Sequence, residues 1–223
     1  MHKAEKILLL NPLVQKRKSQ ILPGFSNIGD FQDGVFDTEN NISPWTNGAC
    51  NVDSKLMLVG QDWASAKWLS DPTNKKYAAI GRNPQLTTNK NIDFYLDLFG
   101  LKFQDVYATN AFVHVKNGDM SGQIPTSVFN DSINTYLIPQ IKIINPKIVV
   151  CLGAQTFNGL RKALGHQIVK INSGHINSIS LNTSSIYGVF HPGGLGTAGA
   201  GGKEVAIKQW EYLANLFKKI NGE

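Results

Sequence analysis

The chain has 223 residues, a formal net charge of +6, and 42% hydrophobic and 17% charged residues. A chain of this length can bury one full-sized core, so we expect a single domain over residues 1–223. Its apolar runs are strand-sized and fall well short of the ~20 residues that cross a bilayer. We therefore expect a cytoplasmic protein with no membrane partner, most simply a monomer.

The positive charge suits a polyanionic partner, because neutralised phosphates release counterions. The basic clusters at residues 16–18 and 218–219 equally suit the solvated ends of helices, so charge leaves both interpretations open. The two cysteines, Cys50 and Cys151, argue against a disulfide framework.

In chain order, residues 4–20 are typical of a helix, and residues 21–54 are an irregular segment rich in Gly, Asn, Asp and Pro. Long irregular segments are often functional or wrap the surface. From residue 55 onward, short apolar runs alternate with stretches of helical periodicity. This pattern predicts strands at residues 55–59, 106–109, 148–152 and 185–190, and helices at 92–99, 127–144 with a kink at Pro139, 155–164 and 203–220.

The predicted strands lack polar alternation, which indicates a sheet covered on both faces. The pattern predicts an α/β fold, a three-layer α/β/α sandwich with a central, mainly parallel four-stranded sheet.

Polar residues follow the predicted strands where each one ends. Gly60-Gln61-Asp62, Asn110 and His191 all occupy such positions. Parallel strands share one carboxyl edge, where open α/β folds bind ligands, so these side chains can converge. Taken singly, an Asp after a strand often caps a turn, and a His-Pro pair is often only a loop feature.

The glycine-rich stretch at residues 193–202 contains a match to G-x-G-x-x-G at Gly194, Gly196 and Gly199. That dinucleotide fingerprint needs a second strand with an acidic residue about 20 positions onward, but residues 203–220 already form a helix. The phosphate-loop pattern fails too, because Glu204 follows Lys203. A flexible loop remains, able to offer N–H groups to a phosphate.

Four segments together resemble the uracil-DNA glycosylase superfamily. Residues 58–62, Leu-Val-Gly-Gln-Asp, resemble its first motif, and residues 191–195, His-Pro-Gly-Gly-Leu, resemble its second motif, His-Pro-Ser-Pro-Leu. Residues 107–111 resemble the Thr-Asn-Ala strand end of the iron-sulfur branches, and residues 145–154 are similar to the strand before the family's next helix. Order and spacing match over residues 55–217, whereas residues 1–54 form a divergent N-terminal segment.

The resemblance implies a DNA glycosylase that hydrolyses the N-glycosidic bond of uracil, or of a related deaminated base, in base-excision repair. Asp62 would stabilise the sugar cation and activate water, and His191 would donate to O2 of the leaving base. Asn110 would read the uracil edge, and Leu195 would fill the space of the flipped base.

The main chain at Gly60 and Gln61 would also contact the base, and an aromatic ring should stack on it. Trp63 and Tyr77 are predicted for the substrate site, with Trp68 and Phe112 as further candidates. Arg82 would approach the substrate or form a surface ion pair.

The sequence departs from the family's motifs at several positions, and each departure bears on what we expect of the site. Ala64 stands where the best-known branch has a Tyr that excludes thymine, and Gly193-Gly194 replace Ser-Pro. Two cysteines cannot supply the four ligands of an iron-sulfur cluster, so we expect a branch without it, and no metal or cofactor. The chain lacks an obvious catalytic lysine near the motifs, which predicts a monofunctional enzyme.

Two alternatives stay open. The same fold could hold DNA or a modified nucleotide without turnover, or Asp62 and His191 could act on a free nucleoside.

Overall fold

The central sheet forms from the runs that are apolar on both faces. The computed structural model describes residues 1–37, 39–172 and 175–222. Within them, β2 (Leu56–Gly60), β3 (Tyr107–Asn110), β5 (Ile148–Leu152) and β7 (Ser184–Val189) lie parallel, and β6 (Ser178–Leu181) runs antiparallel beside β7. The strand order is β3-β2-β5-β7-β6.

The predicted α/β class and the four parallel strands are confirmed, but the sheet has a fifth strand. β6 alternates exposed and buried residues over a short polar run, which is typical of an edge strand and gives little apolar signal. That is why the sequence did not predict it.

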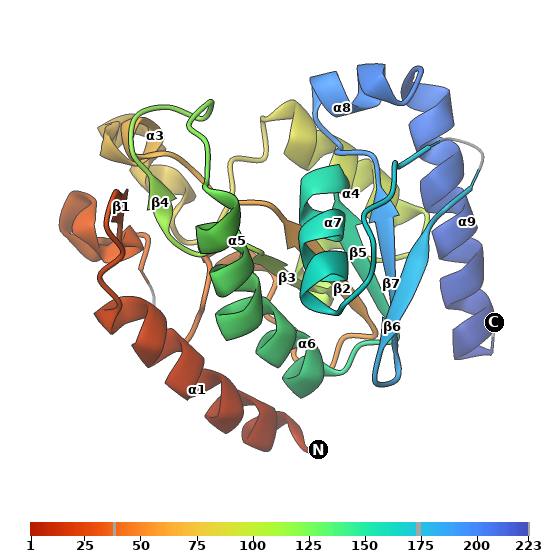
Figure 1. Cartoon of the computed structure of the whole chain (residues 1–223), viewed down its shortest axis with the longest axis horizontal. Helices are drawn as coiled ribbons and strands as arrows, with labels where there is room; N and C mark the ends of the chain where they lie inside the picture. The colour runs from red at the N-terminus through yellow and green to blue at the C-terminus, as the bar shows by residue number, and fades with distance from the viewer. Residues whose placement is uncertain (38, 173–174, 223) are drawn as a thin grey trace.

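Helices cover both faces of the sheet (Figure 1). On one face, residues such as Met57 and Val59 pack in a core shared with α1, α5, α6 and α7. On the other, Leu56 and Leu58 pack in a core shared with α4 and α9. Their bounds are α1 (Lys3–Ser19), α4 (Thr87–Asp97), α5 (Thr126–Ser132), α6 (Ile138–Ile144), α7 (Ala154–Ala163) and α9 (Lys203–Asn221).

The helix predicted at residues 127–144 is interrupted by a π-helical turn, Ile133–Leu137, between α5 and α6. Proline has no N–H and crowds the carbonyl four residues earlier. The irregular turn therefore precedes Pro139, which lies in the first turn of α6.

The irregular N-terminal segment packs beside the loop that follows β2. Its strand β1 (Phe25–Ser26) pairs with β4 (Val115–Lys116), and its helix α2 (Pro44–Gly48) precedes β2. A small third core joins this segment to α3 (Ala66–Ser70); it contains Ile28, Phe36, Ala64, Leu69, Ala78 and Val115. Short 3₁₀ turns occur at Ile28–Asp30, Gln32–Gly34, Pro72–Tyr77 and Phe103–Asp105.

The glycine-rich stretch contains a short helix, α8 (Gly194–Gly199), where the sequence predicted only a loop. Gly201 and Gly202 then adopt positive φ values, 91° and 117°, to start α9. Helices α3 and α8 lie at the same end of the molecule, at the top of Figure 1. None of the helices in the described residues is long and apolar enough to cross a membrane.

Candidate active site

The carboxyl ends of β2 and β5 form the topological switch point of the sheet. The chain runs from β2 to its neighbour β3, and the next strand of the parallel set, β5, lies on the other side of β2. Open α/β sheets bind ligands in the crevice at such a point.

A pocket of about 290 Å³ lies at this edge. It joins the residues that follow β2 to the loop that follows β7, so Asp62 and His191 both line it, and the structure brings these two residues together. Its volume is near the lower limit for small-molecule sites and suits a single heterocyclic base. The lining residues are Trp45, Gly60, Gln61, Asp62, Trp63, Ala64, Trp68, Arg82, Asn83, Leu86, Thr88, Asn89, Met120 and His191.

The Asp62 carboxylate is buried and forms an ion pair that the sequence did not reveal. Its side chain is 8% exposed, and Oδ2 lies 2.8 Å from Nζ of Lys116, whose side chain is 5% exposed. The backbone carbonyls of Gly60 and Gln61 accept bonds of 2.8 Å from the N–H groups of Ala111 and Phe112. These bonds tie the loop that carries Asp62 to the end of β3. The fold thus brings a lysine that is 54 residues away in sequence beside the motif acid.

The His191 ring is oriented by its own loop. The backbone N–H of Gly193 donates to Nδ1 at 3.0 Å, so a neutral imidazole carries its proton on Nε2. Removal of water by the surrounding protein lowers the pKa of His191, and the Asp62 carboxylate opposes this in part. The residue keeps an open side toward solvent, so the ring can reach an incoming ligand.

Asn110 is buried next to Gly60 rather than exposed in the pocket wall. The hydroxyl of Ser43 accepts from the N–H of Trp45 and donates to Oδ1 of Asn110. The amide nitrogen therefore points away from Ser43, and in the described part of the chain it has no hydrogen-bond partner. A Cβ on Gly60 would lie 2.7 Å from that nitrogen, so it sits directly behind a residue that lines the pocket.

The predicted aromatic residues separate into three groups. Trp63 and Trp68 line the pocket, and the indole N–H of Trp63 donates to the Gly81 carbonyl at 2.7 Å. Tyr77 stays outside the lining, with its ring stacked 6.3 Å from that of Trp68. Phe112 is fully buried in the core beneath α1 and α5, where it packs against Phe25.

Leu195 and Arg82 occupy different surroundings. Leu195 is 93% exposed on α8, where it is free to contact a partner. Arg82 both lines the pocket and pairs with Asp93 at 2.6 Å, and its guanidinium lies 3.9 Å from the ring centre of Phe103. Arg82 therefore forms the expected ion pair, and its side chain also reaches the pocket wall.

Several lining or supporting residues were missed, among them Trp45, Met120 and Lys116, and also Leu86, Thr88 and Asn89 at the start of α4. Trp45 lies in the segment that lacks periodicity, although Ser43-Pro44 is a recognisable helix start. Met120 and Lys116 follow β3 in a stretch that has no regular pattern. For them the sequence carries no local signal.

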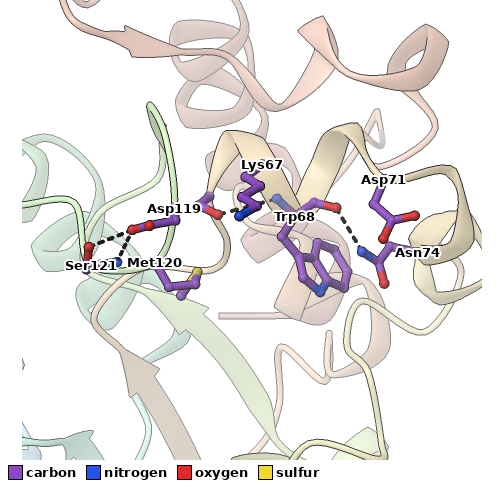
Figure 2. A pocket seen from close by; sticks show the side chains of 8 residues that line it. Lys67, Trp68, Asp71, Asn74, Asp119, Met120 and Ser121 are labelled. Atoms are coloured by element: carbon purple, nitrogen blue, oxygen red, sulfur yellow. Dashed lines mark hydrogen bonds between the residues drawn. The ribbon is translucent and has the colours of Figure 1, made fainter.

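A second, wider hollow of about 460 Å³ adjoins the pocket and shares Trp68 and Met120 with it. Figure 2 shows these two side chains between the acidic residues Asp71 and Asp119. Asp119 accepts from Ser121, and Asn74 donates to the Trp68 carbonyl at 2.8 Å. The shared side chains make one continuous surface beside the candidate site.

The cysteines do not fit an iron-sulfur cluster. Cys50 is exposed beside β3, and Cys151 is buried within β5, where burial raises the pKa of its thiol. An all-cysteine cluster takes four thiolates, and the sequence has two. In the described ranges, no group of three or more His, Cys, Asp and Glu side chains could hold a metal ion.

A buried carboxylate and an imidazole share one pocket at the carboxyl edge of an α/β sheet, the edge at which enzymes of this fold class bind their ligands. The model of the uracil DNA glycosylase superfamily matches residues 47–214, and the chain belongs to this family. The match begins at residue 47, inside the N-terminal segment whose sequence shows none of the family's motifs.

A relative from Thermotoga maritima carries the name type-4 uracil-DNA glycosylase. It is 27% identical over 145 residues, which cover 65% of this chain and 68% of the relative. The predicted family and the predicted general function, DNA glycosylase in base-excision repair, are confirmed at this level.

Proposed function

We propose that this protein is a monofunctional DNA glycosylase that hydrolyses the N-glycosidic bond of uracil, or of a related deaminated base, flipped out of DNA. The observation that carries the proposal is the meeting of Asp62 and His191 in one pocket of about 290 Å³. We further propose that it acts as a monomer in the cytoplasm.

The reaction separates charge, because the sugar becomes cation-like while the base departs as an anion. Asp62 would stabilise the sugar cation and orient the attacking water. Its carboxylate is 8% exposed, and charge interactions are screened less in such a site than in bulk water. This interaction strengthens in the transition state, which is the requirement for catalysis.

His191 would donate from Nε2 to O2 of the departing base. The bond from Gly193 to Nδ1 supports this tautomer, and the lowered pKa supports a neutral ring near pH 7. A neutral donor stabilises the anion without passing its proton to the base first.

Recognition of the base would use the groups around Gly60. A base seated directly against Gly60 would bring O4 of uracil to the amide nitrogen of Asn110 behind it, and Oδ1, which accepts from Ser43, keeps a second lone pair for N3–H. The main chain of Gly60 and Gln61 would contact the ring, and Trp63 would stack on it. Tyr77 would act through Trp68, on which it stacks.

The DNA would be held open by Leu195. Flipping a base costs a few kcal/mol, and an apolar side chain that occupies the vacated position recovers part of that cost. The 93% exposure of Leu195 on α8 leaves it free for this contact.

The test uses single-stranded and duplex oligonucleotides that carry one uracil, under single-turnover conditions, with alkali to reveal abasic sites. We expect product, and a loss of about 10²-fold or more in rate for Asp62→Asn and for His191→Ala. Asp53→Asn and His166→Ala are matched controls. Asp53 pairs with Lys6 at 3.2 Å before β2, and His166 is exposed after α7.

Salt-dependent DNA binding without product on uracil, hypoxanthine or xanthine would favour the binding alternative over the enzyme. Product formation that neither substitution slows by at least ~10-fold would refute the roles of Asp62 and His191.

A further inference from the structure

We propose that Lys116 is a positioning residue that holds the Asp62 carboxylate in place for the reaction, and that it does not itself touch the sugar. This inference rests on the proposed function and adds a residue to that site.

The ion pair between the two side chains is close and largely buried. Nζ of Lys116 lies 2.8 Å from Oδ2 of Asp62, and the side chains are 5% and 8% exposed. Within the part of the chain that the structure describes, Oδ2 makes no well-angled hydrogen bond. The ammonium group is therefore what compensates the burial of this carboxylate.

The ammonium group is itself fixed by the fold. Nζ donates to the carbonyl of Met120 at 2.8 Å. The Lys116 backbone pairs with Phe25 in β1 and forms a bridge with Ser65, which caps α3 shortly after Asp62. Both sides of the ion pair are thus anchored to the same small unit of structure.

The position of Lys116 indicates that it orients Asp62 rather than reacts with the substrate. Asp62 and Met120 line the pocket, whereas Lys116 does not. A lysine nucleophile must be a neutral amine that reaches C1′ of the sugar. This lysine lies outside the lining, and its nitrogen is engaged by a carboxylate and a carbonyl, as suits a charged ammonium group.

Loss of one partner of a buried ion pair leaves the other charge uncompensated. Without Lys116, the carboxylate would turn toward other donors or toward water and would no longer be oriented toward the sugar. Because Asp62 acts mainly on the transition state, the loss should appear in kcat rather than in KM.

The first experiment is a double-mutant cycle on uracil DNA with Lys116→Met, Asp62→Asn and the pair. We expect Lys116→Met to lower kcat about 10²-fold with KM nearly unchanged, since a small misplacement can cost that much. In the Asp62→Asn background the same change should cost less than about 2-fold, because residues that act as a unit are not additive. Lys116→Arg should recover part of the rate.

Lys6→Met is the matched control. Lys6 is also a largely buried lysine, 12% exposed, that pairs with an aspartate, Asp53, at 3.2 Å and donates to the carbonyls of Val52 and Ile144. It lies at the opposite end of β2, so its loss should leave kcat unchanged. Equal losses for Lys116→Met in both Asp62 backgrounds would show a merely structural role and overturn the inference.

A thermal unfolding cycle on the same variants needs no turnover. Lys116→Met should lower Tm by several degrees, and the double variant should regain part of that loss because no buried charge remains unpaired. No recovery in the double variant would overturn the pairing, whatever the activity. If the wild-type protein shows no turnover, the proposed function fails while this cycle still reports on the pair.

Borohydride trapping on abasic DNA separates support from nucleophilic chemistry. We expect no covalent adduct. An adduct that Lys116→Met abolishes would make Lys116 the nucleophile and overturn its assignment as a positioning residue.

Discussion

Gly60 leaves room in the candidate site because it has no side chain. A Cβ at this position would lie 2.7 Å from the Asn110 amide nitrogen and 3.1 Å from the Trp45 ring. We expect Gly60→Ala to displace Asn110 or Trp45 and to lower kcat/KM for uracil about 10²-fold, because misplacement of about 1 Å can have that effect. Single-turnover assays measure this loss.

Gly188→Ala is the matched control for added bulk. Its Cβ would lie 2.4 Å from the Phe157 ring in the core, and overpacking of this kind typically costs about 1–3 kcal/mol of stability. We expect that variant to unfold at lower urea concentration and to keep the wild-type rate while folded. If Gly60→Ala kept the wild-type rate, the end of β2 would accommodate the added methyl group, and the position of Asn110 would not depend on the missing side chain at Gly60.

The three polar residues that the sequence placed at one edge share one property, which is that they lie at or shortly after the ends of strands. Asp62, Asn110 and His191 were predicted to converge because apolar runs identify strands and parallel strands end at one edge. Lys116 lacks that signal: it lies in a two-residue strand beyond Asn110, and its partner Asp62 is distant in sequence. Only the folded arrangement reveals such a pair.

At the scale of elements, helix α2 links the N-terminal segment to the site. Ser43 caps α2 by accepting from the N–H of Trp45, and the same hydroxyl donates to Asn110. We expect Ser43→Ala to cost about 1 kcal/mol of stability through the lost cap. It should also lower kcat/KM for uracil about 10-fold, because the Asn110 amide is then free to turn.

Urea unfolding and single-turnover assays measure the two effects. Ser184→Ala serves as the control, since its buried hydroxyl donates to the Pro146 carbonyl at 2.6 Å at the far end of β7. Ser184→Ala should lower the free energy of unfolding by a similar amount and keep the wild-type kcat/KM. An unchanged rate for Ser43→Ala would mean that Asn110 holds its orientation without this bond.

The elements that were predicted correctly carry their own periodicity, and those that were missed depend on contacts elsewhere. Strand β5 forms at the predicted residues because all its side chains are buried. Trp45 of helix α2 packs in the core shared with α4 and α9, and Val115 of the β1–β4 pair packs in the small core shared with α3. A segment that buries its apolar residues against a distant element has no need of a regular pattern of its own.

At the scale of the whole molecule, the core beneath α1 holds an ionisable group that the proposed reaction does not use. His114 is 4% exposed, and its ring lies between those of Phe112 and Tyr136. Burial, and next the charge of Arg17 on α1, lower the pKa of His114 to about 4. The folded protein thus holds this imidazole neutral.

The lowered pKa makes stability depend on pH in a definite direction. Between pH 6.5 and 4 the unfolded chain binds a proton at His114 that the folded protein does not, so the free energy of unfolding falls with decreasing pH. A shift from 6.5 to about 4 corresponds to about 3 kcal/mol in total. His191, whose pKa is also lowered, adds a change of the same sign.

Urea unfolding at several pH values between 7 and 4 tests this expectation. His114→Phe keeps an aromatic ring among its neighbours and removes the titrating group, so it should flatten most of the slope and leave the part due to His191. His166→Gln, at an exposed position, should leave the slope as it is in the wild-type protein. If His114→Phe retained the full wild-type slope, the loss of stability in acid would come from other groups, and the ring beneath α1 would not be held neutral by burial.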